Sequence, residues 1–421
     1  MNKYKISLLS NKAPLIIVPI KGALTATVLV MVKTGSKYEN KKNNGISHFL
    51  EHMFFKGTKK RPNTLSLAGA LDSLGAEYNA FTGKECTGYW VKSAVNKFKD
   101  ALDIVSDMLL NSKMDSEEIE REKGVIIEEL NMYEDNPMMH VEDIFESCLY
   151  GDNPAGWETI GTKENIKKFQ QKDFLDYLDS QYGANSAYIV LAGKISEKDK
   201  QAAIKLFSGF KSNKWKNKVS VKEKQSRPQM KILQKKIDQA NLSLGVRACP
   251  VGAADEFAVR LLSIILGGSM SSRLFINLRE REGLAYYVRT MTEFYSDSGY
   301  LTTQAGVPAD KTKKSVEIIL KEYKKLTEEK VSASELKRAK DLLRGKSLLQ
   351  MEATDNLATW YARQAVFRKK IITPKEYLAI INKIKAEDLQ RVAKKIFVNR
   401  GLNLAIIGKV KEDNIKDILK F

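Results

Sequence analysis

The sequence predicts an α+β protein made of two homologous domains, each an α/β sandwich of helices against a mostly antiparallel sheet. Three observations support this fold class. The 421 residues exceed what a single hydrophobic core usually supports. Strand-like and helix-like stretches alternate along the chain. Their order then recurs in the second half, which indicates an internal repeat.

The first half supplies the elements of one such domain. Stretches rich in β-branched and aromatic residues predict strands, and apolar residues at helical spacing predict helices. One of these helices stops at Gly75. The expected strands are 14–20, 25–34, 76–80, 87–93 and 187–194, and the expected helices are 65–74, 96–111, 115–135, 170–181 and 197–207.

The second half repeats this order at a nearly constant offset. Residues 241–246 parallel 27–32 at an offset of 214, residues 335–338 parallel 118–121 at 217, and residues 404–409 parallel 189–194 at 215. We therefore expect an N-terminal domain at 1–211, a polar, lysine-rich linker at 212–229 and a C-terminal homologous domain at 230–421.

Composition indicates a globular protein of a reducing compartment. The hydrophobic content is 43%, and no apolar run reaches the ~18 residues of a membrane span. The apolar stretch near the N-terminus is too short for a signal-peptide core. Cys86, Cys148 and Cys249 have no regular spacing, which argues against a disulfide framework. We expect a cytoplasmic protein with no membrane partner.

The net charge of +19 raises the question of a nucleic-acid partner. Basic residues are, however, spread along the whole chain, and acidic residues are interleaved with them. This distribution favours a solvated, lysine-rich surface, so no nucleic-acid partner is expected. If the field acts on substrates, it favours acidic or neutral peptides.

One short motif concentrates the candidate chemistry. His48 and His52 are two of only three histidines in the chain, and Glu51 directly precedes the second. On a helix, positions i and i+4 lie on the same face, so both imidazoles can reach one metal ion. Glu51 lies beside them, close enough to touch a water on that metal. The array His-x-x-Glu-His is the reverse of the better-known zinc protease motif.

A catalytic zinc site needs a third protein ligand, and Glu129 is the best candidate. It lies in a predicted helix, seven residues and so two turns after Glu122, on the same face. Glu128 points about 100° away from Glu129. We therefore predict Glu129 as the ligand, with Glu122 supporting the site from behind.

These residues resemble the pitrilysin/insulinase family of inverzincin metallopeptidases, and the short two-domain members in particular. In that family the histidine motif precedes a ligand glutamate by some three-quarters of a hundred residues, within a Glu-x(6)-Glu pair. Here His52 precedes Glu129 by 77 residues, and the pair is Glu122 and Glu129. The resemblance implies one Zn²⁺ per chain held by His48, His52 and Glu129, with Glu51 as general base on a zinc-bound water.

Structural roles for the histidines are the alternative to metal binding. Two histidines on a helix can be satisfied core residues, and His140, which has no partner at ligand spacing, is best read that way. The second half has lost the chemistry: at an offset of 217, Glu129 corresponds to Lys346 and Glu122 to Ala339, and no histidine follows His140. A second zinc site of this type is therefore excluded.

The family resemblance also suggests where substrate binds. Arg279 and Tyr286 match an Arg-x(6)-Tyr element that holds substrate at the cleavage site, as donors suited to a carbonyl or a developing oxyanion. Asn79 and Ala80 match a Gly-x-x-x-Asn-Ala-x-Thr strand whose edge pairs with the substrate backbone. The plain alternatives are a solvated helix end followed by buried tyrosines, and an ordinary sheet edge.

The resemblance thus implies a zinc-dependent endopeptidase that cleaves unfolded peptides inside a closed chamber, of which this chain forms half of a clamshell. A homodimer is the default, and a heterodimer is the alternative. Three rival functions remain: a catalytically silent or processing-peptidase-like subunit, a basic nucleic-acid-binding protein, and a zinc hydrolase of other substrates. The intact His48, Glu51, His52 and Glu129 argue against the silent subunit.

Overall fold

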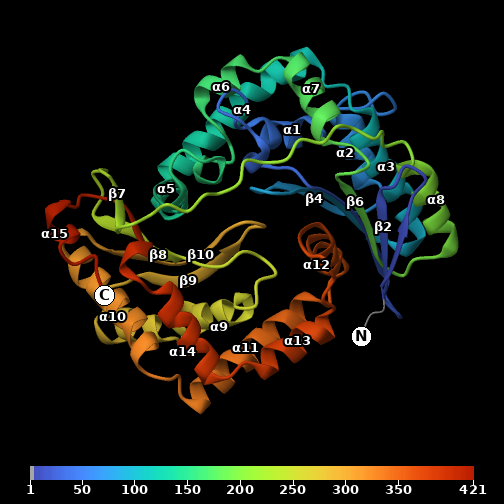
Figure 1. Cartoon of the computed structure of the whole chain (residues 1–421). Coiled ribbons are helices and arrows are strands. Elements are labelled where there is room, and N and C mark those ends of the chain that lie inside the picture. Colours follow the sequence, from blue (N-terminus) through green and yellow to red (C-terminus); the bar gives the residue numbers. More distant parts are fainter. Residues whose placement is uncertain (1–3) are drawn as a thin grey trace. The chain divides into compact units, whose positions relative to one another are not determined.

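Two β-sheets, each covered by helices on both faces, form the framework of the chain (Figure 1). The computed structural model describes residues 4–421, so residues 1–3 of the first predicted domain lie outside it. The chain divides into two units, which we describe separately. Unit 1 contains the chain up to Asn131 together with residues 157–219 and 348–374. Unit 2 contains residues 132–156, 220–347 and 375–421.

Unit 1 is built on a six-stranded sheet in the order β1-β2-β6-β3-β5-β4. Its strands are β1 (Lys5–Leu8), β2 (Pro14–Pro19), β3 (Thr25–Val32), β4 (Glu77–Thr82), β5 (Thr87–Ala94) and β6 (Ala187–Gly193). Only the β2–β6 pair is parallel. The central strands β3 and β6 are apolar and almost wholly buried, as expected for strands covered on both faces. The strand β4 lies at one edge.

Unit 2 repeats this topology with five strands in the order β7-β11-β8-β10-β9. These strands are β7 (Gln229–Leu233), β8 (Gln239–Arg247), β9 (Tyr287–Phe294), β10 (Gly299–Pro308) and β11 (Leu402–Ile407). The β7–β11 pair is parallel and the others are antiparallel, as in the corresponding pairs of unit 1. The sequence predicted two mostly antiparallel α/β sandwiches, and this prediction is confirmed.

Helices cover the sheets and carry most of the site. Those of unit 1 are α1 (Ile46–Met53), α2 (Thr64–Asp72), α3 (Phe98–Asn111), α6 (Lys163–Lys168), α7 (Gln171–Gln181), α8 (Glu197–Phe207) and α12 (Thr354–Phe367). Those of unit 2 are α5 (Pro137–Tyr150), α9 (Glu256–Gly267), α10 (Thr312–Glu328), α13 (Pro374–Lys383), α14 (Ala386–Ile396) and α15 (Asp413–Lys416). Two long helices, α4 (Ser116–Asp135) and α11 (Ala333–Gln350), each run from one unit into the other.

Each half of the sequence contributes one helix to the unit that is built mainly from the other half. The helix α12 comes from the second half of the sequence but packs on β3 and β6 of unit 1, where Leu357 and Tyr361 join the core around Leu29. The helix α5 comes from the first half but packs on β8 and β11 of unit 2. Their bounds differ by 217 residues, so they are equivalent parts of the repeat. The bounds of the compact units therefore differ from the predicted domain bounds. The predicted bounds describe the sequence repeat and remain a prediction.

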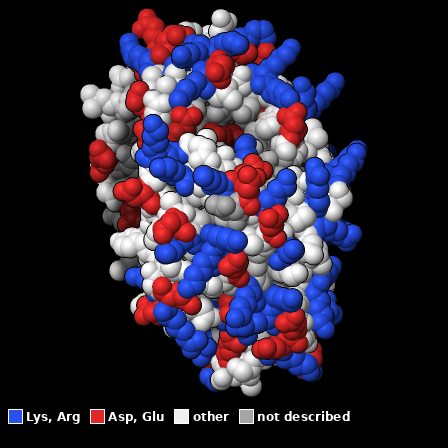
Figure 2. Space-filling view, turned by 90° about the vertical axis from the view of Figure 1, so that its left-hand side faces the viewer, with Lys and Arg blue, Asp and Glu red and all other residues white. Residues whose placement is uncertain are grey.

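Surface charge is mixed rather than gathered. On the face drawn in Figure 2, acidic side chains are interleaved with the lysines and arginines. Elsewhere in the described chain, oppositely charged side chains form exposed pairs, such as Lys172 with Asp176 and Lys330 with Glu387. Among residues 4–421, no helix combines the length and apolar character needed to cross a membrane.

Candidate metal centre

The helix α1 presents the His-x-x-Glu-His motif on its partly open face. Ile46, Phe49, Leu50 and Met53 are spaced along one helical stripe, and all four are buried. This burial fixes which way the helix is turned. His48, Glu51 and His52 consequently lie on the remaining face, where they are only partly covered.

The start of α1 is fixed by a glycine and a buried carboxylate. Gly45 has φ 101°, and a Cβ there would lie 2.6 Å from the carbonyl oxygen of Ile160. The side chain of Glu39 accepts hydrogen bonds from the backbone N–H groups of Gly45 and Ser47, both at 2.8 Å. Burial raises the pKa of Glu39, although hydrogen bonds from Ser47, Gly45 and Asn44 oppose this shift. Glu39 thus satisfies backbone donors at the start of α1.

We expect Glu39→Ala to lower the free energy of unfolding by about 1–3 kcal/mol, because it leaves buried N–H groups of α1 without acceptors. Urea unfolding of the full chain measures this change. Glu39→Gln retains one acceptor oxygen and should lose less, and Glu120→Ala, at an exposed position, should lose almost nothing. An unchanged midpoint for Glu39→Ala would contradict the capping role.

Three side chains converge as metal ligands do. Nε2 of His48 lies 3.6 Å from Oε1 of Glu129, and Nε2 of His52 lies 3.4 Å from Oε2 of Glu129. One donor atom from each residue can be chosen so that all three lie within 4.8 Å of one another. Zinc bonds of ~2.0–2.2 Å in tetrahedral geometry place neighbouring ligand atoms roughly 3.3–3.5 Å apart. The donor types fit zinc, and the two histidine–glutamate distances are close to this spacing.

Glu122 orients the second histidine. Its Oε1 lies 2.9 Å from Nδ1 of His52, and its Oε2 is paired with Nζ of Lys56. This bond leaves Nε2 of His52 as the nitrogen that faces Glu129, as in carboxylate–histidine–zinc arrangements. The role of Glu122 in supporting the site stays a prediction.

Charge at the site is balanced between histidine and carboxylates. Burial lowers the pKa of His52, but hydrogen bonds and charge from Glu122 and Glu129 outweigh it and raise the pKa to about 9. Hydrogen bonds from His48 and His52 hold the pKa of Glu129 well below its usual value. Burial alone raises the pKa of Glu122, but hydrogen bonds and charge from His52 and Lys56 outweigh burial and hold this pKa below its usual value. The carboxylates of Glu122 and Glu129 are thus ionised.

The candidate base lies between the ligands and the edge strand. One carboxylate oxygen of Glu51, Oε2, accepts a hydrogen bond from Thr82 Oγ1 at 2.5 Å. Thr82 ends β4, which packs beside α1. Asn79 and Ala80 lie on the same edge strand, with Asn79 exposed and Ala80 buried. Glu51 and the edge strand therefore share one side of unit 1.

Comparisons with known proteins identify the family of this chain. A family model described as Insulinase (Peptidase family M16) matches residues 16–163, and one described as Peptidase M16 inactive domain matches residues 168–343. A Rickettsia felis protein named as an uncharacterized zinc protease is 35% identical over 96% of this chain and 97% of its own length. The chain belongs to peptidase family M16.

Other members share the fold and most of the length. The beta subunit of the human mitochondrial-processing peptidase is 30% identical to this M16 chain over 93% of the chain and 82% of the subunit. A solved protease from Helicobacter pylori superposes with a TM-score of 0.92, at 22% identity, over 97% of this chain and 100% of its own. The human subunit confirms the family, and the Helicobacter pylori protease confirms the fold.

The two remaining predicted residues of this M16 chain lie in unit 2. Arg279 belongs to a π-helix, η4 (Phe275–Arg281), and its guanidinium carbon lies 4.9 Å from the ring centroid of Phe275. Tyr286 directly precedes β9, and 79% of its surface is exposed. Neither side chain is a buried packing residue, and π-helical turns are frequent at functional sites. Their role in substrate binding stays a prediction.

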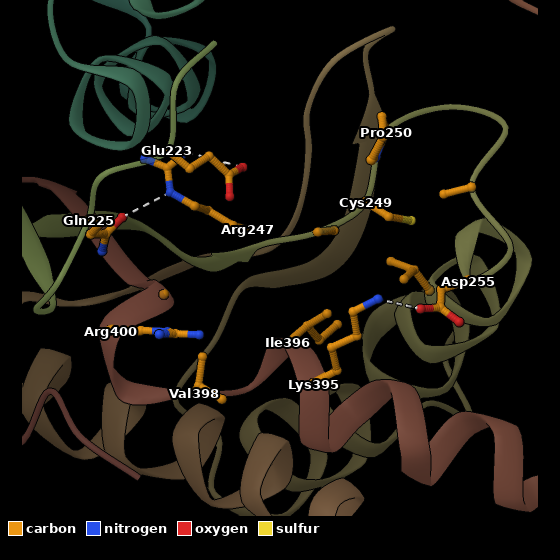
Figure 3. Close-up of a pocket in the computed structure, with 14 residues that line it drawn as sticks. Glu223, Gln225, Arg247, Cys249, Pro250, Asp255, Lys395, Ile396, Val398 and Arg400 are labelled. Atoms are coloured by element: carbon orange, nitrogen blue, oxygen red, sulfur yellow. Dashed lines mark hydrogen bonds and ion pairs between the residues drawn. The ribbon is translucent and has the colours of Figure 1, made fainter.

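Unit 2 also contains a cavity of about 590 Å³, between the end of β8, the start of α9 and the end of α14 (Figure 3). Two of its cationic side chains are paired within the protein. Lys395 donates to Asp255 at 2.8 Å, and Arg247 lies 3.6 Å from the carboxylate of Glu223. No residue predicted for the site lines it. This cavity is therefore not part of the candidate metal centre.

Three residues that contact the site were missed by sequence reasoning. Glu39 lies seven residues before the helix that it caps, in a stretch without a recognisable capping pattern. Lys56 follows the motif by one helical turn from His52, and this spacing was a usable signal. Thr82 was visible only as the last residue of the edge-strand motif.

Proposed function

We propose that this chain is a zinc-dependent endopeptidase that cleaves unfolded peptides. The observation that carries the proposal is the convergence of His48, His52 and Glu129, whose donor atoms lie within 4.8 Å of one another, with Glu51 beside them. Zinc at this position supplies a Lewis acid that polarises the scissile carbonyl and makes an attacking water more acidic. Membership of a peptidase family supports peptide bonds as the substrate.

The protein's own groups account for proton transfer. Glu51 takes a proton from the attacking water and delivers it to the leaving amine. Its position on the same helix face as the two histidines keeps the carboxylate near the reacting atoms. Thr82 holds one of its oxygens, so the other remains available for the proton.

Substrate selection would come from the edge of the sheet. The strand β4 has a partner, β5, on one side only, so its outer backbone groups can pair with an extended peptide. Asn79 and Ala80 lie at the middle of this edge. Main-chain pairing tolerates many side chains, and it requires an extended substrate. We infer a preference for unfolded over folded polypeptides.

The first experiment measures metal content and cleavage together. We expect about one zinc per purified chain, cleavage of a mixed pool of unfolded peptides, loss of cleavage with a chelator, and recovery when zinc is restored. A folded protein of similar composition serves as the control substrate and should survive. Zinc binding without peptide cleavage would favour another hydrolase or a silent subunit. Tight, salt-sensitive nucleic-acid binding unaffected by chelator would favour the nucleic-acid-binding alternative.

The assembly and compartment are further proposals. We infer a homodimer, because the chain carries both the zinc ligands and the Arg279 and Tyr286 element, and a heterodimer is the alternative. The name of the mitochondrial-processing peptidase beta subunit supports a partner of some kind. Three free cysteines support a reducing compartment such as the cytoplasm. Light scattering of the purified chain distinguishes monomer from dimer.

Arg279→Ala and Tyr286→Phe should each lower the cleavage rate by about 10²-fold, the scale typical of removing one oxyanion-type donor. Zinc content should stay at the wild-type level, since neither residue is a metal ligand. Steady-state cleavage with parallel elemental analysis tests both points. Arg344→Gln, an exposed arginine of the same unit, should leave the rate unchanged. Full activity in both variants would return Arg279 and Tyr286 to a structural role.

A further inference from the structure

The hydroxyl of Thr82 contacts the carboxylate of Glu51. Oγ1 of Thr82 donates to Oε2 of Glu51 at 2.5 Å and lies 3.4 Å from the backbone oxygen of Ser47. Within residues 4–421, no other side chain hydrogen-bonds to Glu51. One carboxylate oxygen is therefore held by the protein, and the second is left without a protein partner.

The backbone of Thr82 is itself held firmly. It pairs with Thr87 at the turn between β4 and β5, and this turn is closed by a hydrogen bond from Gly83 N to Cys86 O at 2.9 Å. The turn packs tightly against the backbone of Gly35, where a Cβ would lie 2.1 Å from the carbonyl oxygen of Gly83. Movement of this turn would require movement of the neighbouring backbone as well.

A buried ionic cluster fixes the same turn. Glu85 Oε1 lies 2.8 Å from Nζ of Lys37 and 3.2 Å from Nζ of Lys218, and the three side chains are 3%, 0% and 7% exposed. Separating such groups leaves a buried charge without its partner, which is strongly unfavourable. Thr82 stands at one end of this turn. The cluster therefore restrains the backbone next to Thr82.

We propose that Thr82 is a positioning residue for Glu51, holding the carboxylate so that its free oxygen faces the attacking water. This inference rests on the proposed function, in which Glu51 is the general base. A carboxylate that can rotate freely spends part of its time away from the reacting atoms, and a single directional hydrogen bond removes that freedom. Because the turn is anchored, the Thr82 hydroxyl stays in one position and holds the carboxylate there.

The test compares two substitutions of Thr82 in the zinc-loaded full chain. Thr82→Val keeps the shape but removes the hydroxyl, and we expect kcat to fall by about 10–100-fold, the range typical for partners that support a metal site. KM and zinc content should change little. Thr82→Ser restores a donor and should recover most of the lost kcat. A structural defect alone would not produce this pattern of loss and rescue.

Thr87→Val is the matched control. Thr87 is the cross-strand partner of Thr82, but its hydroxyl donates to the backbone oxygen of Thr34 at 3.0 Å and not to Glu51. It should retain the wild-type kcat. Equal losses in Thr82→Val and Thr87→Val, or wild-type kcat in Thr82→Val, would overturn the inference.

A crystal structure of zinc-loaded Thr82→Val gives a second readout that needs no activity. We expect the Glu51 carboxylate to leave its position in this variant and to keep it in Thr82→Ser. An unmoved carboxylate in Thr82→Val would overturn the inference. A wild-type chain without peptidase activity would instead overturn the proposed function, and the Glu51 position would still decide whether Thr82 holds it.

Discussion

Glu51→Gln should retain one zinc per chain and lose nearly all turnover. The amide has the size and shape of the carboxylate, so the fold of α1 and the positions of His48 and His52 should not change. A neutral amide cannot accept a proton at the pH of the assay. General acid–base groups typically contribute 10²–10⁴-fold to the rate, and a loss in that range is expected here.

The experiment compares kcat, KM and zinc content for Glu51→Gln and for Glu128→Gln. Glu128 is an exposed glutamate next to Glu129, the predicted ligand, so its substitution controls for a general change of charge near the site. We expect Glu128→Gln to behave as the wild type. Cleavage by Glu51→Gln at a rate within a few-fold of wild type would make Glu51 a structural residue and leave the reaction without its proposed base.

Local patterns in the sequence were sufficient to single out the residues of the candidate metal centre. The spacing of His48 and His52 depends only on helical periodicity, and the same holds for Glu122 and Glu129 on α4. The structure brings the two pairs together, with His52 Nε2 3.4 Å from Glu129 and His52 Nδ1 2.9 Å from Glu122. The repeat was also visible, because Leu242, Leu244 and Val246 of β8 match the apolar Val28, Val30 and Val32 of β3 at alternate positions.

Long-range packing was not predictable from such patterns. The apolar faces of α5 and α12 show that each helix packs on something, but not on which of two similar sheets it packs. The exchange of these helices is set by the whole fold. For the same reason, the bond from Glu39 to the start of α1 and the bond from Thr82 to Glu51 could not be found, since they join residues by tertiary contacts rather than by spacing.

His52→Ala should abolish stoichiometric zinc binding, and with it all cleavage. Only His48 and Glu129 would remain, and two protein ligands seldom hold zinc. The substitution also removes the partner of Glu122 Oε1, although Lys56 still neutralises that carboxylate, so the chain should fold. Activity alone cannot separate a lost metal from a lost base, and elemental analysis is therefore the deciding measurement.

The third histidine provides the control for this prediction. His140 is buried in unit 2, on α5, and is not one of the converging ligands. His140→Ala should therefore keep one zinc per chain even if it lowers stability through lost packing. Full zinc occupancy in His52→Ala would refute the assignment of His48, His52 and Glu129 as the metal site. Loss of zinc in His52→Ala but not in His140→Ala, together with zinc retention in Glu51→Gln, would separate the residues that bind the ion from the residue that moves the proton.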